Sequence, residues 1–383
     1  MGAPNKRLAT QAFAFSKGAL WLDRTITEGS AWQGGTSMRA KILVVAIGIA
    51  VAVGGLGWWI FGQAASGFSA EEFQAWADSM NANGYEISVD RISGSKDWVV
   101  LDDLVVANPV EGWQWTGAEA RVAGSLDGEG MTINISGDQT LSYRIAGENQ
   151  AHNFTAVAFR VTLEPNGDGG VGAVTVDMAN VNLERGDDQP IGAARGQIRL
   201  DPGDGPNIVP DGSVVTVQFT NLVLPKFRQS AFGDTIKRVF AVVELQLGLD
   251  GLDPGAQIIA WQRSGRSLAK VTSAGLTWGL FSFEADGTLK LDSSYRPEGT
   301  LQAEVRNFFP ALGPITAAGL LDAGAGENFK FLVVEEFGNP NPASLFMGLR
   351  IRDGQIELRQ DEIGLPVINL GGLPPLLGLP PRE

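Results

Sequence analysis

The sequence predicts a mainly β protein (α+β), with antiparallel, curved or meandering sheets and a few short helices, on a single N-terminal transmembrane helix. Three observations predict it: short runs in which apolar and polar residues alternate, 50 glycines with recurrent Asp-Gly pairs between the runs, and one long apolar segment near the N-terminus. Alternation puts neighbouring side chains on opposite faces of a strand, and Asp-Gly and similar pairs favour turns.

Residues 1–37 show no sustained apolar periodicity. They carry four Lys or Arg and two Asp or Glu, and they end in a Gly/Thr/Ser segment. One interpretation is a short disordered cytoplasmic tail. The other is an upstream extension with Met38 as the biological start, because Met-Arg-Ala-Lys before an apolar run is typical of export segments. We favour the second.

Residues 38–66 form the expected signal-anchor. Residues 42–61 are 20 consecutive positions without a charged or polar side chain, and a helix of that length spans about 30 Å, the thickness of a bilayer's hydrocarbon core. Arg39 and Lys41 precede the run and two tryptophans lie near its end, which predicts an N-terminus-in orientation. Cleavage after the anchor is the alternative, but the run is longer than a usual signal core. We therefore expect a single-pass inner-membrane protein with most of its chain in the periplasm.

The charge changes sign at this segment. Residues 1–41 hold six Lys or Arg and two Asp or Glu, a net +4, so the remaining residues carry −18 of the total −14. An acidic exterior domain repels phosphate backbones, which argues against nucleic-acid binding. The chain has no cysteine, so it has neither a disulfide framework nor thiol chemistry.

The exterior domain, residues 67–383, begins with a predicted helix. Residues 69–72 read as a capping box, apolar residues then recur at helical spacing, and Gly84 supplies a stop. Strands follow, with alternation over residues 85–90, 157–163 and 215–219. Two lobes, 67–225 and 226–383, are a further expected division.

The second part of the domain is predicted as a meander followed by helices. Residues 275–308 read as three antiparallel strands, with Asp286-Gly287 as a type I′ hairpin turn. The segment before them fits a helical stripe or a strand, and we favour a strand from about Ile236. Residues 315–324 and 327–337 suggest short helices, and Asp353-Gly354 suggests another hairpin. The tail 365–383 holds five prolines, which suggests an extended strap without a regular ladder.

Several stretches together resemble a known family. LTWG from Leu276, DGTLKLDSSYRPEGTLQAEVRNF from Asp286, AWQRSGRSL from Ala260 and LRIRDGQIEL from Leu349 are similar to an uncharacterised family of alphaproteobacterial envelope proteins, domain of unknown function 2125. The resemblance covers nearly everything after Met38 and implies an inner-membrane anchor with a periplasmic β-rich domain. It implies no catalytic residue. A looser similarity to AsmA-like proteins, which are linked to lipid handling, is fold analogy.

Catalytic motifs are missing from the sequence. His152 is the one histidine, and we expect it in a turn with a solvated or capping role. The acidic glycine-rich loops at 166–170 and 201–207 do not fit calcium-binding frames and are expected to be turns. The adjacent pair Asp102-Asp103 points to opposite faces of a strand, which suits no paired acid/base role. We expect no enzyme activity, no metal site and no cofactor.

Tryptophans on predicted strands are the candidate binding residues. Most such aromatics belong to a core, but some could line an apolar groove for an acyl chain, because few helices are available to cover the sheet. The candidates are Trp98, Trp113, Trp115, Trp261 and Trp278. The expected function is therefore a non-enzymatic envelope protein that binds lipid or another hydrophobic ligand. Two alternatives stay open: a scaffolding or assembly subunit that binds a protein partner through sheet edges and the Pro-rich strap, and a hydrolase that uses carboxylates alone.

Overall fold

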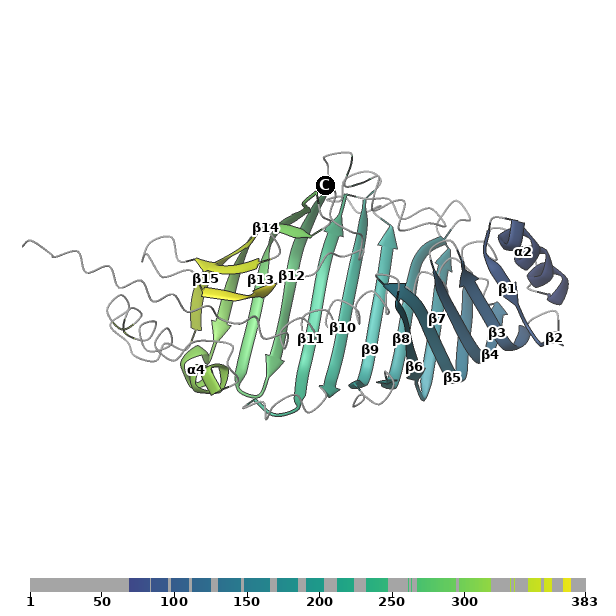
Figure 1. The fold of residues 1–383 in the computed structure, drawn as a ribbon, viewed down its shortest axis with the longest axis horizontal. Helices are drawn as coiled ribbons and strands as arrows, with labels where there is room; N and C mark the ends of the chain where they lie inside the picture. The colour runs from purple at the N-terminus through teal and green to yellow at the C-terminus, as the bar shows by residue number, and fades with distance from the viewer. Residues whose placement is uncertain are drawn as a thin grey trace, which may run out of the picture.

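A computed structural model shows a single sheet of 17 strands in which every pairing among the described residues is antiparallel. The structure describes 69–82, 84–95, 98–109, 112–124, 130–145, 148–165, 171–184, 191–202, 212–223, 232–246, 267–293, 296–317, 344–352, 355–359 and 368–372, with Trp261, Arg263, Phe331 and Val334. The strands stand side by side along the long axis of the molecule (Figure 1). The predicted anchor, 42–61, lies outside these residues. None of the helices in the described part is long and apolar enough to cross a membrane.

The first half of the sheet follows helix α2 (Ala70–Ala82), which begins one residue after the predicted Ser69 cap. Its strands are β1 (Glu86–Ser88), β2 (Arg91–Ser95), β3 (Trp98–Asn108), β4 (Trp113–Gly124), β5 (Met131–Ile145), β6 (Glu148–Thr155), β7 (Ala158–Pro165), β8 (Val171–Glu184) and β9 (Ile191–Pro202). We call each strand position across the sheet a lane, and two short strands can share one lane. Strands β1 and β2 share the lane beside β3, and β6 and β7 share the lane between β5 and β8. The other strands pair in chain order.

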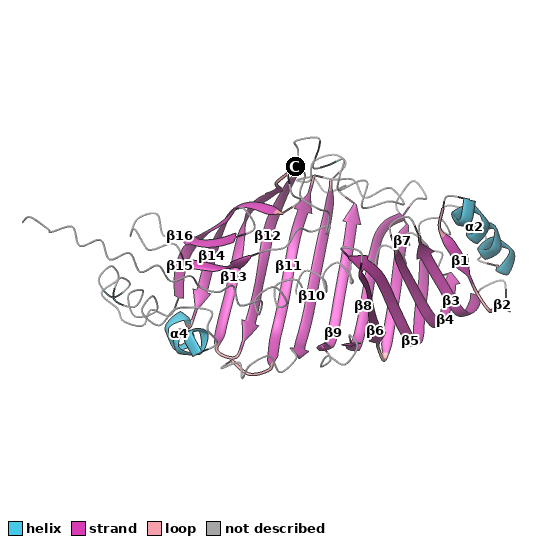
Figure 2. Ribbon diagram, viewed as in Figure 1, coloured by secondary structure: helices cyan, strands magenta, loops and turns pink. Residues whose placement is uncertain are grey.

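The second half continues the same meander. Its elements are β10 (Ser213–Val223), β11 (Thr235–Leu245), β12 (Leu268–Trp278), β13 (Phe281–Leu291), β14 (Pro297–Arg306), α4 (Phe308–Ala317), β15 (Ser344–Arg352), β16 (Gln355–Arg359) and β17 (Ile368–Gly372). Figure 2 shows how few helices accompany the strands. The β10–β11 ladder runs through the boundary between the two expected lobes without a break in register.

The mainly β antiparallel fold with few short helices is thus confirmed, and so is the strand from the Ile236 region, as β11. The helix predicted after Phe308 exists as α4 and begins earlier, at Phe308 rather than at residue 315; residues 318–324 of the predicted helix lie outside the described residues. The second predicted helix, 327–337, lies outside the described residues except for Phe331 and Val334, both of which are helical.

Three local predictions are wrong. Asp286-Gly287 is not a hairpin turn: it lies inside β13, and the chain reverses at Gly279-Leu280, where Gly279 has φ 58° and Trp278 pairs with Phe281. His152 lies in β6, paired with Leu141, and not in a turn. Part of the tail forms strand β17, because residues 367–373 between the prolines keep all their backbone N–H donors.

Asp286-Gly287 lies opposite a β-bulge of β12 rather than in a turn. Val271 pairs with Gly287 and Ala274 pairs with Ala285, so two residues of β12 face Asp286 alone. Gly287 has φ 149°, and a Cβ there would collide with the carbonyl oxygen of Thr300. Glycine is required at this site by close backbone approach rather than by a turn.

A backbone irregularity recurs at the same level in successive strands of the first part of the sheet. We call this row of irregular positions the kink line. Its members with left-handed backbone are Asp103 (φ 52°) in β3, Gly137 (φ 79°) in β5, Asn180 (φ 49°) in β8 and Asn221 (φ 50°) in β10. The registers place them at one level, because Asn180 and Asn221 both face Ala194 of β9. At each crossing an extra residue resets the alternation: in β3 the buried positions move from Val99 and Leu101 to Leu104 and Val106.

Two hydrophobic cores lie on the same face of the sheet. The N-terminal core joins the apolar face of α2, including Phe73 and Trp76, to side chains of β3–β9. The C-terminal core joins α4, through Phe308 and Leu312, to β13–β15. Between these cores lie β10, β11 and β12.

Candidate functional site

The sheet face that carries both cores continues across β10–β12 as a row of partly exposed apolar side chains. We call this surface the central apolar face. It consists of Val215, Val217 and Phe219 from β10, Val239, Ala241 and Val243 from β11, and Ala274 and Leu276 from β12. No charged side chain is among them, so this surface can offer only hydrophobic contact.

Strand register explains why these residues form one surface. Phe219 pairs with Val239, Val239 with Leu276, and Leu276 with Phe283 of β13. A second row joins Val217, Ala241 and Ala274 in the same way. Directly paired side chains lie on the same side of a sheet, so each row is continuous across the lanes.

Burial distinguishes the central apolar face from the cores on either side. Ile198 of β9 is 6% exposed and Ala303 of β14 is 2% exposed, whereas all eight residues of the central apolar face are only half-buried. Among the described helices, α2 contacts β1 and β2 and α4 contacts β13. Neither helix therefore covers β10–β12.

Two phenylalanines on neighbouring strands mark the two sides of the sheet. Phe219 belongs to the central apolar face and lies over Gly196 of β9, where a Cβ would come within 2.6 Å of its ring. Phe240 of β11 lies on the opposite face over Gly275 of β12, beneath the Arg238 guanidinium, which is 4.4 Å from its ring centroid. The opposite face is mixed, since it also carries Thr216, Gln218 and other polar side chains.

The candidate tryptophans of β3 and β4 do not gather in one groove. Trp115 is 1% exposed in the N-terminal core, and its Nε1 donates to Gln139 Oε1 at 3.3 Å. Trp113 is half-buried beside that core, edge-on to Tyr85 at 6.3 Å between ring centroids. Trp98 lies on the other face, under the Arg121 guanidinium at 4.8 Å.

The remaining two tryptophans belong to the second half of the chain. Trp278 ends β12, donates from Nε1 to the Gly233 carbonyl at 3.0 Å, and lies 5.3 Å from the ring of Phe232. It is near the rim of the central apolar face, where it pairs with Ile236. Trp261 is 8% exposed, and its immediate neighbours in the chain, Ala260 and Gln262, lie outside the described residues.

Several of the ionisable groups form surface pairs. Hydrogen bonds from Arg199 lower the pKa of Glu164, and hydrogen bonds from Lys270 and Thr272 lower the pKa of Glu244. Both acids are therefore held ionised and cannot donate protons near neutral pH. Asp102 of the adjacent acidic pair accepts from Arg91 at 2.7 Å. In the residues that the structure describes, no group of three His, Cys, Asp or Glu side chains could hold a metal ion.

Sequence reasoning missed the residues of the central apolar face as a site. Their alternation was visible and correctly predicted the strands, but it did not show that eight apolar side chains from three strands share a surface. The sequence signal for an uncovered apolar face was the scarcity of helices. We used that signal to choose tryptophans as candidate binding residues, and not the residues of the central apolar face. Bulky aromatics attract attention, whereas the open surface is made largely of Val and Ala.

The fold and this surface define a class: a single-sheet antiparallel meander with helices at its two ends and an apolar face between two cores. The chain belongs to the family described as "uncharacterized protein conserved in bacteria", DUF2125, whose model matches residues 63–359. This confirms the resemblance seen in the sequence. No curated protein and no solved structure matches the chain.

Proposed function

We propose that this protein binds an acyl chain of a lipid, or a similar hydrophobic ligand, on the central apolar face, without catalysing a reaction. The observation that carries the proposal is that one continuous apolar sheet face is partly exposed across β10–β12, whereas Ile198 on one side of it and Ala285 and Ala303 on the other are buried in the two cores. Apolar patches that stay exposed in a folded protein are typical of binding surfaces.

The chemistry of the face favours an alkyl chain over a polar ligand. Its side chains offer no hydrogen-bond donor or acceptor, and each ligand CH₂ removed from water contributes about 0.8 kcal/mol. Lanes of a sheet are about 4.8 Å apart, so the passage from β9 to β13 is roughly 19 Å wide, enough for many methylenes. Strand alternation keeps the polar side chains on the other face.

The predicted anchor supplies a source for such a ligand. We propose that residues 42–61 hold the chain in the inner membrane and that the sheet stands in the periplasm, where acyl chains are within reach of a tethered domain. The acidic net charge of the exterior domain disfavours adhesion to anionic headgroups, so contact with the lipid is assigned to the apolar face. The looser likeness to AsmA-like proteins points the same way, as fold analogy.

Photocrosslinking in living cells tests this proposal with a matched pair of positions. The full chain carries either Phe219→p-benzoylphenylalanine or Phe240→p-benzoylphenylalanine, and adducts are identified by mass spectrometry after irradiation. Both positions are half-buried aromatics over a glycine, on adjacent strands and opposite faces. We expect lipid adducts from position 219 and none from position 240.

Equal lipid adducts from both positions would indicate nonspecific contact with membrane or detergent. A variant with Phe219→p-benzoylphenylalanine that folds and gives no lipid adduct overturns the proposal. Adding Val217→Gln should abolish the adduct because it puts a polar side chain on the same face, whereas Thr216→Gln, on the opposite face of β10, should leave it unchanged.

A scaffolding role is the second candidate, and one observation favours it. Strand β2 lies at an open edge of the sheet, four of its five residues are exposed, and within the described residues it pairs only with β3. Unpaired edge groups can bind a strand of another protein. Protein adducts from Ser93→p-benzoylphenylalanine, without lipid adducts from position 219, would support this role.

A further inference from the structure

A polar hollow lies beside the kink line on the face opposite the cores. It has a volume of about 930 Å³ and is lined by strands β5 and β7–β10. Ala158, Ala179 and Ala194 keep its floor low, because their short side chains stand next to the longer polar ones of neighbouring positions. The kink line thus forms one side of a depression rather than a flat sheet surface.

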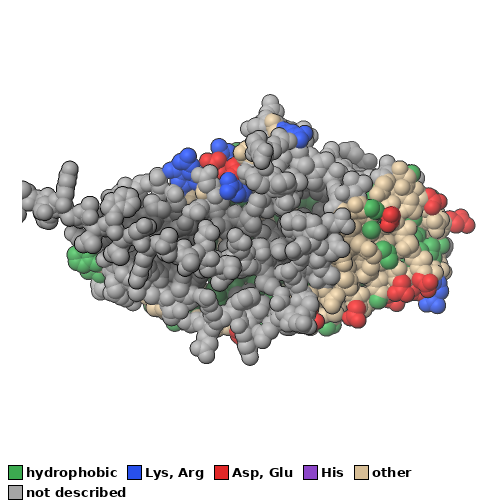
Figure 3. Space-filling view, in the orientation of Figure 1, with side chains coloured by type: hydrophobic (Ala, Val, Ile, Leu, Met, Phe, Trp, Pro, Cys, Tyr) green, Lys and Arg blue, Asp and Glu red, His purple; other side chains and the backbone are tan. Residues whose placement is uncertain are grey.

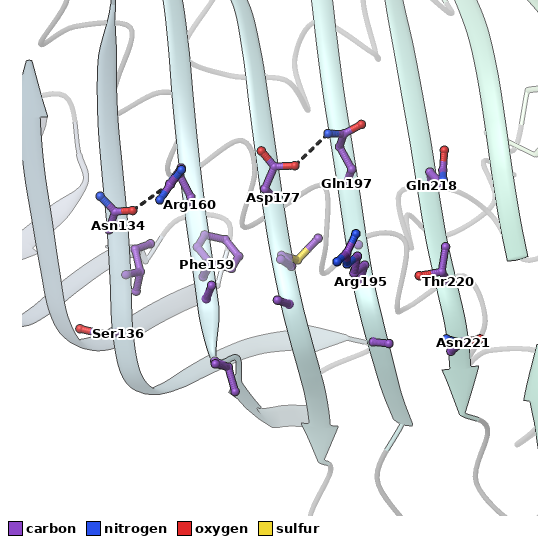
Figure 4. A pocket seen from close by; sticks show the side chains of 17 residues that line it. Asn134, Ser136, Phe159, Arg160, Asp177, Arg195, Gln197, Gln218, Thr220 and Asn221 are labelled. Atoms are coloured by element: carbon purple, nitrogen blue, oxygen red, sulfur yellow. Dashed lines mark hydrogen bonds between the residues drawn. The ribbon is translucent and has the colours of Figure 1, made fainter. Parts of the chain in front are cut away.

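Polar side chains cross this hollow in a single line. Asn134, Arg160, Asp177, Gln197 and Gln218 are paired from strand to strand. Arg160 Nε donates to Asn134 Oδ1 at 3.1 Å, and Gln197 Nε2 donates to Asp177 Oδ1 at 2.8 Å. Figure 4 shows these side chains in line, with Arg195, Thr220 and Asn221 farther along the strands.

The two arginines leave positive charge unmatched in the hollow. Arg160 and Arg195 are exposed, and within the described residues neither forms an ion pair, although Arg91, Arg199, Arg296 and Arg306 all do. Asp177 is the one acid among the described residues of the lining. The lining therefore carries two positive charges and one negative charge, in a chain whose net charge is −14. Acidic side chains are instead prominent at the end of the molecule that carries α2 (Figure 3).

We propose that this hollow binds a phosphate group, carried by a small phosphate ester or by a lipid headgroup. Arg160 on β7 pairs with Asp177 of β8, and Arg195 on β9 pairs with Ala179 of β8. The two arginines are therefore two lanes and two residues apart, roughly 12 Å, with the small Ala179 beside Arg195. A phosphate above Ala179 can accept from both guanidinium groups, whose planar forks suit its several oxygens. Gln197 of β9, diagonal to Ala179, adds a neutral donor. The site does not depend on the proposed acyl site, because it lies on the other face of the sheet.

Binding to the full chain in neutral detergent tests this proposal with two probes. Equilibrium dialysis measures labelled glycerol 3-phosphate, and native mass spectrometry counts phosphatidylglycerol retained by the solubilised protein. The variants are Arg160→Gln and Arg195→Gln. The matched control is Arg121→Gln, which removes the same charge from the same face at a position outside the hollow.

We expect at least one probe to bind with one-to-one stoichiometry, each hollow variant to weaken it about tenfold, and the control to leave it unchanged. Binding of glycerol 3-phosphate alone identifies a soluble ester, and binding of phosphatidylglycerol alone identifies a headgroup. The proposal is overturned if neither probe binds, or if all three variants bind equally. These arginines are exposed, so an unchanged unfolding transition shows that any loss is local.

Discussion

The two halves of the sheet contain the same kind of alternating strand, but their apolar faces are buried to different degrees. In β3–β9 the apolar face is closed: Phe159, Val161 and Leu163 are at most 2% exposed. In β10–β12 the equivalent positions, such as Val217 and Val239, are half-buried although they are just as apolar. The difference teaches that an apolar sheet face does not define a core by itself. What packs against the face decides whether it stabilises the fold or stays available for a ligand.

The largest expected effect comes from removing matched aromatic rings from the two halves. Phe159→Ala should lower the free energy of unfolding by about 3–5 kcal/mol, because it leaves a cavity in a closed core. Phe219→Ala should cost roughly 1–2 kcal/mol, because its ring is already partly in water. Urea unfolding of the full chain in neutral detergent, followed by tryptophan fluorescence, measures both. Equal losses would contradict the distinction between the halves. Phe346→Ala, at a ring that is 69% exposed, is the control.

Two glycines under aromatic rings sharpen the comparison. A Cβ at Gly117 would come within 2.8 Å of the indole of Trp115, which is 1% exposed and has no room to move. Gly117→Ala should therefore cost about 1–3 kcal/mol. Gly196→Ala meets the ring of Phe219 at a similar distance, but that ring can turn toward open space, so we expect a cost below about 1 kcal/mol. The same unfolding assay compares them, and a greater loss at Gly196 would show that the Phe219 ring is held as firmly as a core residue.

The kink line gives a third comparison, within one residue position. Asn221 has φ 50°, a conformation that costs a β-branched residue about 1–2 kcal/mol and costs glycine little. Asn221→Val should lower stability by that amount, and Asn221→Gly should change it by less than about 0.5 kcal/mol. If both variants change the free energy of unfolding equally, the left-handed backbone conformation is not the reason why asparagine stabilises this position. The pair Asn180→Val and Asn180→Gly repeats the test inside the closed half.

The smallest expected effect concerns the surface pair of Arg199 and Glu164, which joins β9 to β7. Arg199 hydrogen-bonds to Glu164 at 2.9 Å and also to Asp201 and Thr175, and it lowers the pKa of Glu164. A lowered acid pKa adds stability above the ordinary value of 4.5, and that contribution is lost as the pH falls through the lowered pKa. Because both side chains are more than a third exposed, Arg199→Gln should cost only about 0.2–1 kcal/mol at pH 7. The difference from the parent should shrink below pH 4.5, and a difference that grows there would contradict the assignment.

Local patterns were sufficient for much of the fold. The capping box and helical spacing predicted α2, and the period-two alternation predicted β7, β10 and β11, because these signals depend on neighbours in the chain. The Asp353-Gly354 hairpin was confirmed, since Arg352 pairs with Gln355. The pair Asp286-Gly287, with the same letters, was misjudged because glycine is required there by the close approach of the Thr300 carbonyl from β14, a contact between strands that the sequence does not show.

The candidate site shows the limit of the same reasoning. Trp115 and Trp98 are close in sequence and equally aromatic, yet one is buried in the core and the other lies on the opposite face. The polar hollow was not predicted at all. Its line from Asn134 to Gln218 exists only because five separate strand segments meet in register.

The sequence by itself determined the strand-rich composition, the helix at the start of the domain, the family and the acidic charge of residues 42–383, because each is a property of residue types or of near neighbours. Only the tertiary structure decided which apolar side chains are buried and which stay partly exposed. That outcome depends on register, bulges and the reach of two helices across a wide sheet. It also decided which arginines meet acids and which face a hollow, because pairing across strands joins residues that are far apart in the chain.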